Sequence, residues 1–340
     1  MWTQQAFGGW RPWALAVCAL MALDPGWAQT TAPAGTTAAP AQSLNQWLDR
    51  LQDASRRRAY IGTFVVSAGS AMAASKIWHV CDGTQQMERI DSLTGTARTT
   101  LRRNDEVLTF VPESRVAWAE KRDALRPFPD QIKTPGNAIE EYYSVRLLGV
   151  DRVAGVDADV LQILPRDTLR FGYRVWSEKQ TGLAVKMQTL DGQGQVIEQM
   201  AFSELQLDAP VKMETLSRQM AKTEGYKILR PRLNKTTADA QGWRLRQEVP
   251  GFLGMAAHTR GDPAAPAGSL PMQWVFSDGL SSVSLFVEPF DAQRHRQEGH
   301  SVMGATHTLT RRVGEHWLTA MGEVPPATLR QFAQSLERLR

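Results

Sequence analysis

Three groups of side chains in this sequence carry donors or nucleophiles that could do chemistry. His295 and His300, with Glu298 between them, offer two imidazoles and a carboxylate, which are donor types that bind transition-metal ions. Cys81 offers a thiol, which becomes a nucleophile when its surroundings lower its pKa. The segment FSDGLSSV, residues 276–283, places serine hydroxyls beside a carboxylate, as a serine hydrolase would need.

None of these patterns fits the requirements of its chemistry. The spacing of His295 and His300 matches no common metal-ligand motif, and their segment is typical of a loop. Cys81 lies among strand-forming residues, which favours a buried and inert thiol. No general base stands out beside the serines of residues 276–283. The polar residues of this segment are typical of a hairpin turn. Because signatures such as G-x-S-x-G and H-E-x-x-H are also absent, we expect no enzyme, no catalytic residues, no metal and no cofactor.

The elements that would position these side chains begin with a helix. Ser43 and Gln46 form a capping-box pattern, and apolar residues then recur at helical spacing until about Arg56–Arg58. From Tyr60 the period changes to two, and runs such as AYIGTFVVS, EVLTFV and RVAWAE predict an antiparallel meander with one covered face. Residues 138–148 are compatible with a second helix.

Residues 171–207 predict three strands joined by tight turns at Gln180–Gly182 and Asp191–Gly194. Farther along, residues 243–324 predict three or four antiparallel strands, with a flexible loop at residues 261–271. Pro325–Pro326 then favours the start of a final helix over residues 327–339. The elements together predict an α+β protein with two sheets.

Charge and length indicate how the chain is divided. About 310 residues are too many for one compact core, so two domains are expected. Residues 209–235 hold seven basic and two acidic residues, whereas the whole chain has a net charge of only +4. We therefore place a basic connector at residues 209–230, between domains at residues 43–208 and 231–340. Its charge suits lipid phosphates or an acidic partner, or it is a solvated linker; nucleic acid is not expected as a partner.

The beginning of the chain predicts export. Residues 13–23 form an apolar run that is too short to span a membrane, and small residues follow at Gly26 and Ala28. Residues 1–28 are therefore interpreted as a signal peptide cleaved before Gln29, and the low-complexity residues 29–42 as a disordered tether. After cleavage Cys81 is the one cysteine left, so no internal disulfide is expected.

The aromatic content raises the question of an apolar ligand. Tryptophans fall on several predicted strands, and a curved sheet with a helix over it can leave a cavity for an apolar ligand. An ordinary filled core explains the same pattern. If a cavity exists, strand alternation selects these candidates: Phe64, Leu108, Phe110, Trp118, Tyr173 and Val175.

Three long strings carry a family resemblance: YRVWSEKQTGLAVKMQTLD (173–191), FSDGLSSVSLFVEP (276–289) and RRVGEHWLTAMGEVPPATLR (311–330). They resemble the RseB/MucB family of periplasmic regulators of the sigma-E envelope-stress response. The resemblance implies an N-terminal LolA/LolB-like curved antiparallel sheet covered by helices, which would be a sensor domain. It also implies a smaller C-terminal, mainly antiparallel β domain with a terminal helix.

The resemblance further implies a periplasmic negative regulator. Such a protein binds the periplasmic domain of a membrane-bound RseA/MucA-like anti-sigma factor and shields it from a DegS-like protease. Lipid, lipoprotein acyl chains or lipopolysaccharide would release it. On this basis the C-terminal domain is the expected anti-sigma-binding domain, and an extended partner segment could add to its sheet. The candidate contact residues are Phe276, Phe286, Arg311 and Arg312.

Two other functional classes remain open. A periplasmic lipid or lipoprotein carrier would share the N-terminal architecture, although it would not need the second domain. An envelope hydrolase with an unrecognised site is the other alternative. Partner capture and activity screens would separate these classes.

Overall fold

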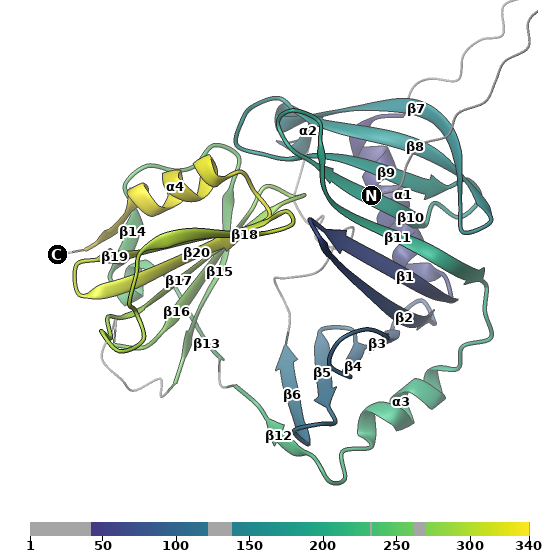
Figure 1. Ribbon diagram of the computed structural model, residues 1–340, viewed down its shortest axis with the longest axis horizontal. Coiled ribbons are helices and arrows are strands. Elements are labelled where there is room, and N and C mark those ends of the chain that lie inside the picture. The colour runs from purple at the N-terminus through teal and green to yellow at the C-terminus, as the bar shows by residue number, and fades with distance from the viewer. Residues whose placement is uncertain (1–41, 122–137, 232, 262–268, 340) are drawn as a thin grey trace, which may run out of the picture. The chain divides into compact units, whose positions relative to one another are not determined.

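The computed structural model describes residues 42–121, 138–231, 233–261 and 269–339 (Figure 1). Residues Gln42–Arg340 form one compact unit. The predicted signal peptide, nearly all of the predicted tether and most of the predicted loop at residues 261–271 lie outside the described residues. No helix within the described ranges is long and apolar enough to cross a membrane.

The first helix, α1 (Leu44–Arg57), begins as the sequence predicts. Ser43 Oγ accepts a hydrogen bond from the backbone N–H of Gln46 at 3.2 Å, and Gln46 Oε1 accepts one from the backbone N–H of Ser43 at 2.9 Å. This confirms the capping box, which satisfies two N–H groups that a helix start leaves unpaired. One face of α1 is buried, through Leu44, Trp47, Leu48, Leu51 and Ala54.

A large sheet follows α1, and the described residues contribute twelve strands to it. The strands are β1 (Tyr60–Ala68), β2 (Ala71–Cys81), β3 (Gln86–Ser92), β4 (Thr99–Arg103), β5 (Glu106–Val111), β6 (Val116–Lys121), β7 (Tyr143–Val153), β8 (Val156–Pro165), β9 (Gly172–Glu178), β10 (Ala184–Leu190), β11 (Val196–Leu207) and β12 (Lys227–Leu229). Their order is β12-β6-β5-β4-β3-β2-β1-β11-β10-β9-β8-β7, which joins two meanders through the β1–β11 pair.

Local turn chemistry explains most of this order. Gly182 and Gly194 adopt positive φ angles of 85° and 78° at the two predicted turns, a conformation that glycine reaches without strain. The hairpins of β9, β10 and β11 are thereby confirmed. The second helix, α2 (Ala138–Tyr142), is shorter than predicted, because the chain from Tyr143 onward pairs with β8 as strand β7.

The segment predicted as a connector contains regular structure. Helix α3 (Met213–Ala221) lies within it, and β12 then pairs with β6, the one parallel pair among the described strands. Lys227 stands opposite Val116 and Leu229 opposite Trp118. Residues 209–230 thus add a helix and an edge strand to the first sheet.

The second sheet has seven antiparallel strands among the described residues, more than the three or four predicted. They are β13 (Leu233–Thr236), β15 (Leu253–Arg260), β16 (Met272–Ser277), β17 (Ser282–Pro289), β18 (Gly299–Met303), β19 (Thr306–Val313) and β20 (His316–Gly322), in the order β13-β15-β16-β17-β20-β19-β18. A short 3-10 helix, η1 (Asp239–Gln241), precedes β14 (Trp243–Leu245), which pairs with β21 (Leu336–Arg338).

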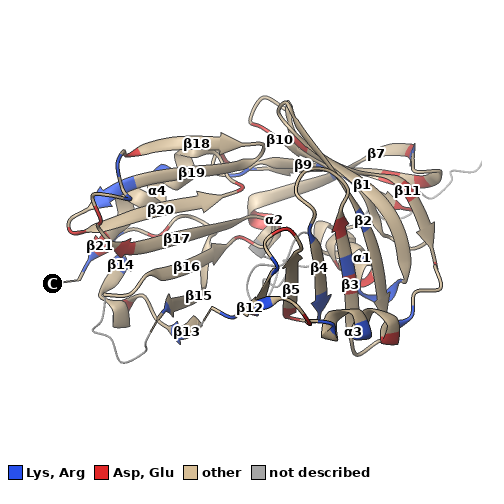
Figure 2. Ribbon diagram, turned by 60° about the horizontal axis from the view of Figure 1, so that its bottom comes forward, with Lys and Arg blue, Asp and Glu red and all other residues tan. Residues whose placement is uncertain are grey.

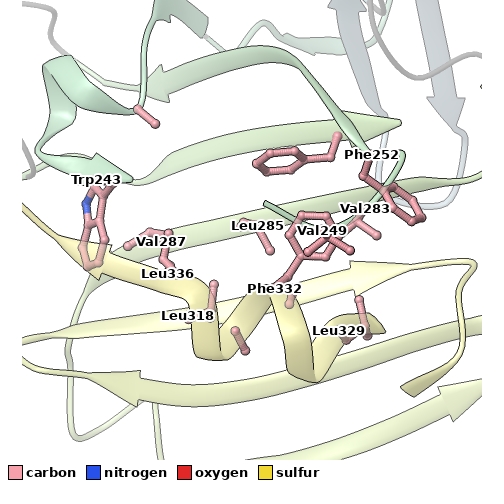
Figure 3. Packing of buried hydrophobic residues seen from close by; sticks show 14 of the residues in the cluster. Trp243, Val249, Phe252, Val283, Leu285, Val287, Leu318, Leu329, Phe332 and Leu336 are labelled. Atoms are coloured by element: carbon pink, nitrogen blue, oxygen red, sulfur yellow. The ribbon is translucent and has the colours of Figure 1, made fainter. Parts of the chain in front are cut away.

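Helix α4 (Pro326–Ser335) lies along β19 and β20 (Figure 1). It starts at the predicted proline but ends earlier than predicted, because Leu336 turns into an extended conformation and enters β21. Leu336 stays buried there and joins the same core as Trp243, Leu285 and Phe332 (Figure 3). The observed architecture, a large helix-covered antiparallel sheet and a smaller sheet with a terminal helix, confirms the predicted α+β class.

Candidate functional site

A cavity of about 1180 Å³ is lined by residues of both sheets and of α3. Val107 and Leu108 of β5, Met220 of α3, and Val275 and Phe286 of the second sheet supply apolar surface. Pockets that bind organic ligands usually measure about 300–1,000 Å³, so this volume suits a large ligand. Apolar side chains from both sheets and α3 thus line one cavity.

The polar part of this cavity is mainly basic. Five lysines and arginines line it, against the two carboxylates Glu106 and Glu120: Arg103, Lys121, Arg230, Lys235 and Arg260. Arg103 forms an ion pair with Glu106 at 2.8 Å. No ion pair with another described residue is formed by Arg230, Lys235 or Arg260. Figure 2 shows further Lys and Arg on β4, α3 and β12. A cavity with this excess of positive charge favours an anionic group in its ligand.

A second cavity of about 400 Å³ lies between α3 and strands β1–β3. Trp78 and Leu216 supply apolar surface, and Arg89 and Lys212 supply charge. Lys76 and Arg89 both lie over the Trp78 ring, at 5.3 Å and 5.2 Å from its centroid. Both cavities therefore border α3.

The two sheets are joined by a buried polar network around Asp278. Asp278 Oδ2 accepts hydrogen bonds from the hydroxyl of Tyr143 and from Nε of Arg170, each at 2.8 Å, and Oδ1 accepts from the backbone N–H groups of Leu280 and Ser281. Arg170 and Asp278 have fully buried side chains. Burial raises the pKa of Tyr143 well above its ordinary value, so this hydroxyl keeps its proton and donates. Four hydrogen bonds, one of them from the Arg170 guanidinium, thus compensate a carboxylate removed from water.

Further contacts extend this junction. Arg170 Nη2 donates to the carbonyl of Pro250 at 2.6 Å, and its guanidinium lies 4.8 Å from the Phe252 ring centroid. Thr328 donates its hydroxyl proton to the carbonyl of Leu169 at 2.7 Å. Ala305 donates its backbone N–H to Glu198 Oε2 at 3.0 Å. Polar contacts at several points thus connect the first sheet with the second.

The six predicted cavity residues are distributed over separate places. Leu108 lines the large cavity, and Phe110 lies beside it in the same cluster, edge-on to Tyr226 at 5.0 Å. Tyr173 and Val175 are buried beneath α1. Phe64 packs against Phe202 at 6.0 Å. Trp118 is exposed. The structure therefore brings Leu108 and Phe110 together and keeps the other four apart from them.

The four predicted partner-binding residues also differ in whether a partner could contact them. Phe286 lines the large cavity, whereas Phe276 is buried and packs 4.8 Å from the ring of Phe332. Arg311 and Arg312 lie on β19. The Arg312 guanidinium lies 4.1 Å from the Phe290 ring centroid and pairs with Glu315 at 3.1 Å.

His295 and the serine-rich turn, both first considered for chemistry, form structural contacts. His295 stacks on Trp317 with centroids 5.0 Å apart, and its two ring nitrogens bond to Asp291 N–H and Glu288 Oε1. Among the described residues, His295, His300 and Glu298 form no group that could hold a metal ion. Cys81 is half-buried and not fully buried as predicted, and this partial burial raises its pKa, which disfavours its thiolate. Residues 277–281 form the hairpin turn that the sequence predicts, closed by the Ser277 hydroxyl, which donates to the carbonyl of Ser281 at 2.9 Å.

Sequence reasoning missed the contribution of α3 and of residues 230–235 to the large cavity. Met220, Arg230 and Lys235 come from the segment that the sequence marked only by its charge. That charge was the available signal. The pairing of Arg170 with Asp278 had no local signal, because 108 residues separate the two partners.

Both halves of the chain match models of known protein families. A family model described as the MucB/RseB N-terminal domain matches residues 43–220, and one described as the MucB/RseB C-terminal domain matches residues 237–337. The sigma factor AlgU regulatory protein MucB of Pseudomonas aeruginosa is 28% identical over 316 residues, which cover 88% of this chain and 92% of that protein. The sigma-E factor regulatory protein RseB of Haemophilus influenzae is 22% identical over 298 residues, covering 87% and 91%.

The fold has a matching solved structure. The crystal structure of MucB in complex with MucA(peri) superposes with a TM-score of 0.66 at 26% identity. The match covers 87% of this chain and 99% of that one. Both sheets, in the same order along the chain, therefore belong to the shared architecture.

Proposed function

The chain belongs to the MucB/RseB family, and on that premise we propose that it is a periplasmic negative regulator of sigma-E-type envelope-stress signalling. It binds the periplasmic domain of an RseA/MucA-like anti-sigma factor and shields that domain from a DegS-like protease. The observation that carries this proposal is the match of both domains, in order, together with the similarity to a MucB structure that contains MucA(peri). The proposed role needs no catalytic group in this chain.

Occlusion is the physical basis of the shielding. A protease needs several residues of extended substrate, and a bound partner removes them from reach, so cleavage falls with the free fraction of anti-sigma factor. The second sheet supplies contact in this proposal through Arg311, Arg312 and Phe286. Strand β18 is an exposed edge to which an extended segment can add through backbone hydrogen bonds. Phe276 supports this surface from inside the core.

In this proposal, a ligand that binds in the large cavity causes the protein to release the anti-sigma factor. Its apolar lining around Leu108 suits acyl chains, and its basic residues Arg230, Lys235 and Arg260 suit anionic head groups. Lipid, lipoprotein or lipopolysaccharide fragments combine these two features. Because both sheets line the cavity, an occupant that contacts both favours one arrangement of the sheets over another and so changes the affinity for the partner. Phe110 backs this pocket, while Phe64, Trp118, Tyr173 and Val175 would contribute only if the ligand extends beyond it.

A reconstituted cleavage assay tests the regulator role. It contains the purified anti-sigma periplasmic domain, the protease and this protein without its first 28 residues. Cleavage is expected to slow as this protein is added and to recover when lipopolysaccharide or lipoprotein fragments follow. An unchanged cleavage rate at a large excess of this protein would show that it does not shield the substrate.

Charge-reversal variants locate the partner contact. Arg311→Glu with Arg312→Glu should weaken anti-sigma binding by at least about tenfold, which corresponds to ~1.4 kcal/mol. Arg98→Glu, an exposed position in a loop of the first sheet, is the matched control and should leave binding unchanged. Equal affinity of all variants would remove Arg311 and Arg312 from the contact.

Neutralising the cavity tests the ligand separately. Arg230→Gln, Lys235→Gln and Arg260→Gln combined should leave shielding intact but raise the lipopolysaccharide concentration needed for release by about tenfold or more. Arg98→Gln serves as the control. Release at the wild-type concentration would place the ligand elsewhere.

The cavity also favours one second candidate, a periplasmic lipid or lipoprotein carrier. Capture of partners from envelope extract distinguishes the two functions, because a carrier retains many lipoproteins and a regulator retains an anti-sigma factor. Localisation is tested by sequencing the N-terminus of the periplasmic protein, which should begin at Gln29. An intact Met1 in that sample would contradict export by signal-peptide cleavage.

A further inference from the structure

The hairpin of β18 and β19 carries two histidines whose ring nitrogens face each other. His300 Nε2 and His307 Nδ1 lie 3.0 Å apart, with ring centroids at 5.1 Å. The register explains this geometry: His300 stands opposite Leu309, and Val302 opposite His307, so the imidazoles occupy diagonal positions on one face of the hairpin. Sequence spacing had paired His300 with His295 instead, and the fold brings a different partner to it.

The facing nitrogens create an unusual proton arrangement. In the absence of a cation, one of them must carry a proton, because two lone pairs 3.0 Å apart repel each other. The outward nitrogens, His300 Nδ1 and His307 Nε2, have no hydrogen-bond partner among the described residues. When a cation binds between them, both protons can reside on the outward nitrogens, where water accepts them. The two inward lone pairs are then available to one cation.

The separation suits a transition-metal ion. Imidazole nitrogens bind such ions at about 2.0–2.1 Å, which places two ligands of a tetrahedral ion about 3.3 Å apart. The observed 3.0 Å needs a shift of only a few tenths of an ångström. Within the ranges that the structure describes, no third His, Cys, Asp or Glu completes a metal-binding group.

We propose that His300 and His307 form a two-imidazole site for a divalent transition-metal ion of the class of Cu²⁺, Ni²⁺ and Zn²⁺, with water in the remaining positions. Neutral imidazole suits these ions, whereas Mg²⁺ and Ca²⁺ prefer oxygen ligands. The general order of divalent affinities places Cu²⁺ above Zn²⁺. The site lies on the same hairpin as Arg311 and Arg312 and beside the β18 edge that the proposed anti-sigma contact uses.

The hairpin that carries the site is held in place by the first sheet. The His307 ring lies 5.8 Å from the ring of Phe171, and Ala305 donates its backbone N–H to Glu198. A side chain at Gly304 would collide with Ala68 and Glu198, so the hairpin tip contacts β1 and β11 closely. These contacts hold the two imidazoles in position before the ion arrives. A bound ion would in turn link β18 to β19 beside the junction of the two sheets.

Calorimetric titration of the mature chain, prepared without a histidine tag, tests this site. The probes are CuSO₄, ZnCl₂ and MgCl₂ at neutral pH. We expect one equivalent of Cu²⁺ to bind, Zn²⁺ to bind more weakly and Mg²⁺ to give no saturable heat. Absence of saturable Cu²⁺ binding up to about 1 mM, a binding free energy of only about −4 kcal/mol, would overturn the proposal.

Three variants make the assignment specific. His300→Gln and His307→Gln should each weaken Cu²⁺ binding by at least about tenfold, whereas His316→Gln, on β20 of the same sheet, should not. Electron paramagnetic resonance of the Cu²⁺ complex should show two nitrogen ligands in the wild type and one in either single variant. Unchanged affinity and nitrogen count in both His300→Gln and His307→Gln would show that the ion binds elsewhere.

Discussion

The two sheets of this molecule differ in how their buried hydrophobic residues are grouped. The second sheet buries 16 hydrophobic residues in one continuous cluster, which includes Trp243, Phe276 and Phe332. The first sheet has more strands, yet the buried hydrophobic residues around it fall into four clusters of 10, 9, 4 and 3 residues, and the cluster of nine includes Leu280 from the β16–β17 turn. The larger sheet therefore has the more divided core.

The division of the first core follows its helices. Helix α1 covers β9 and β10 through Leu44, Leu48 and Leu51. Helix α3 covers the β3–β5 region through Leu216 and Met220, and this is where the clusters are smallest and where both cavities lie. Because few buried apolar contacts hold α3, its region should open more easily than the second sheet. If the proposed function holds, we expect a ligand to enter beside α3 and the partner to bind the more stable second sheet.

The strongest test of this difference is a truncation in the single large core. Phe332 is fully buried against Phe252 and Phe276, so Phe332→Ala should lower the free energy of unfolding by about 4 kcal/mol. Urea unfolding followed by tryptophan fluorescence measures it. Trp118→Ala, at an exposed aromatic position of the first sheet, is the control and should cost less than about 1 kcal/mol. Equal losses in the two variants would contradict the burial pattern.

The next largest effect is expected at the junction of the two sheets. Asp278→Ala leaves the buried guanidinium of Arg170 without its deepest carboxylate partner, which should cost about 3 kcal/mol. Tyr143→Phe removes one of four donors to the same carboxylate and should cost about 1 kcal/mol. Urea unfolding monitored separately by tryptophans of each sheet shows whether the sheets then unfold apart. Similar losses in both variants would mean that the charge pair adds little beyond a single hydrogen bond.

A smaller loss is expected beneath α3. Leu216 is buried in the smallest cluster, and a small cluster beside a cavity can collapse around the space left by a truncated side chain. Leu216→Ala should therefore cost about 2 kcal/mol, the lower end for a buried leucine. Amide hydrogen exchange should rise in α3 and leave β16, β17 and β20 unchanged. A global rise in exchange would show that α3 and the second sheet unfold as one unit.

Local patterns were predictable from the sequence because their causes are local. The capping box at Ser43 and the turns at Gly182 and Gly194 depend on neighbours within a few residues, and the structure confirms all three. The end of α4 was not predicted, because Leu336 leaves helical spacing to pair with β14, which lies about 90 residues earlier in the chain.

The candidate site was only partly predictable for the same reason. Alternation selected Leu108 as a cavity candidate, and Leu108 lines the large cavity. Phe286 also lines it, although the resemblance had offered Phe286 as a partner contact. Neither alternation nor the resemblance says which strands and helices meet, so the sequence could not separate Phe276, in the core, from Phe286, at the cavity. The pairing of His300 with His307 depends on a hairpin register, which sequence spacing alone does not reveal.

The smallest predicted effect concerns the start of α1, the helix that packs on β9 and β10 of the larger sheet. Ser43→Ala removes the acceptor for the Gln46 N–H and should lower the free energy of unfolding by about 1 kcal/mol. Ser55→Ala, near the end of the same helix, is the matched control and should change stability by less than about 0.5 kcal/mol. Because Leu44 and Leu48 follow the cap and pack on Tyr173 and Val175, fraying should raise amide exchange in α1 and β9 while α3 stays unchanged. Faster exchange at α3 in Ser43→Ala would mean that the clusters of the first sheet form one cooperative core, and the contrast between the two sheets would then reduce to their size.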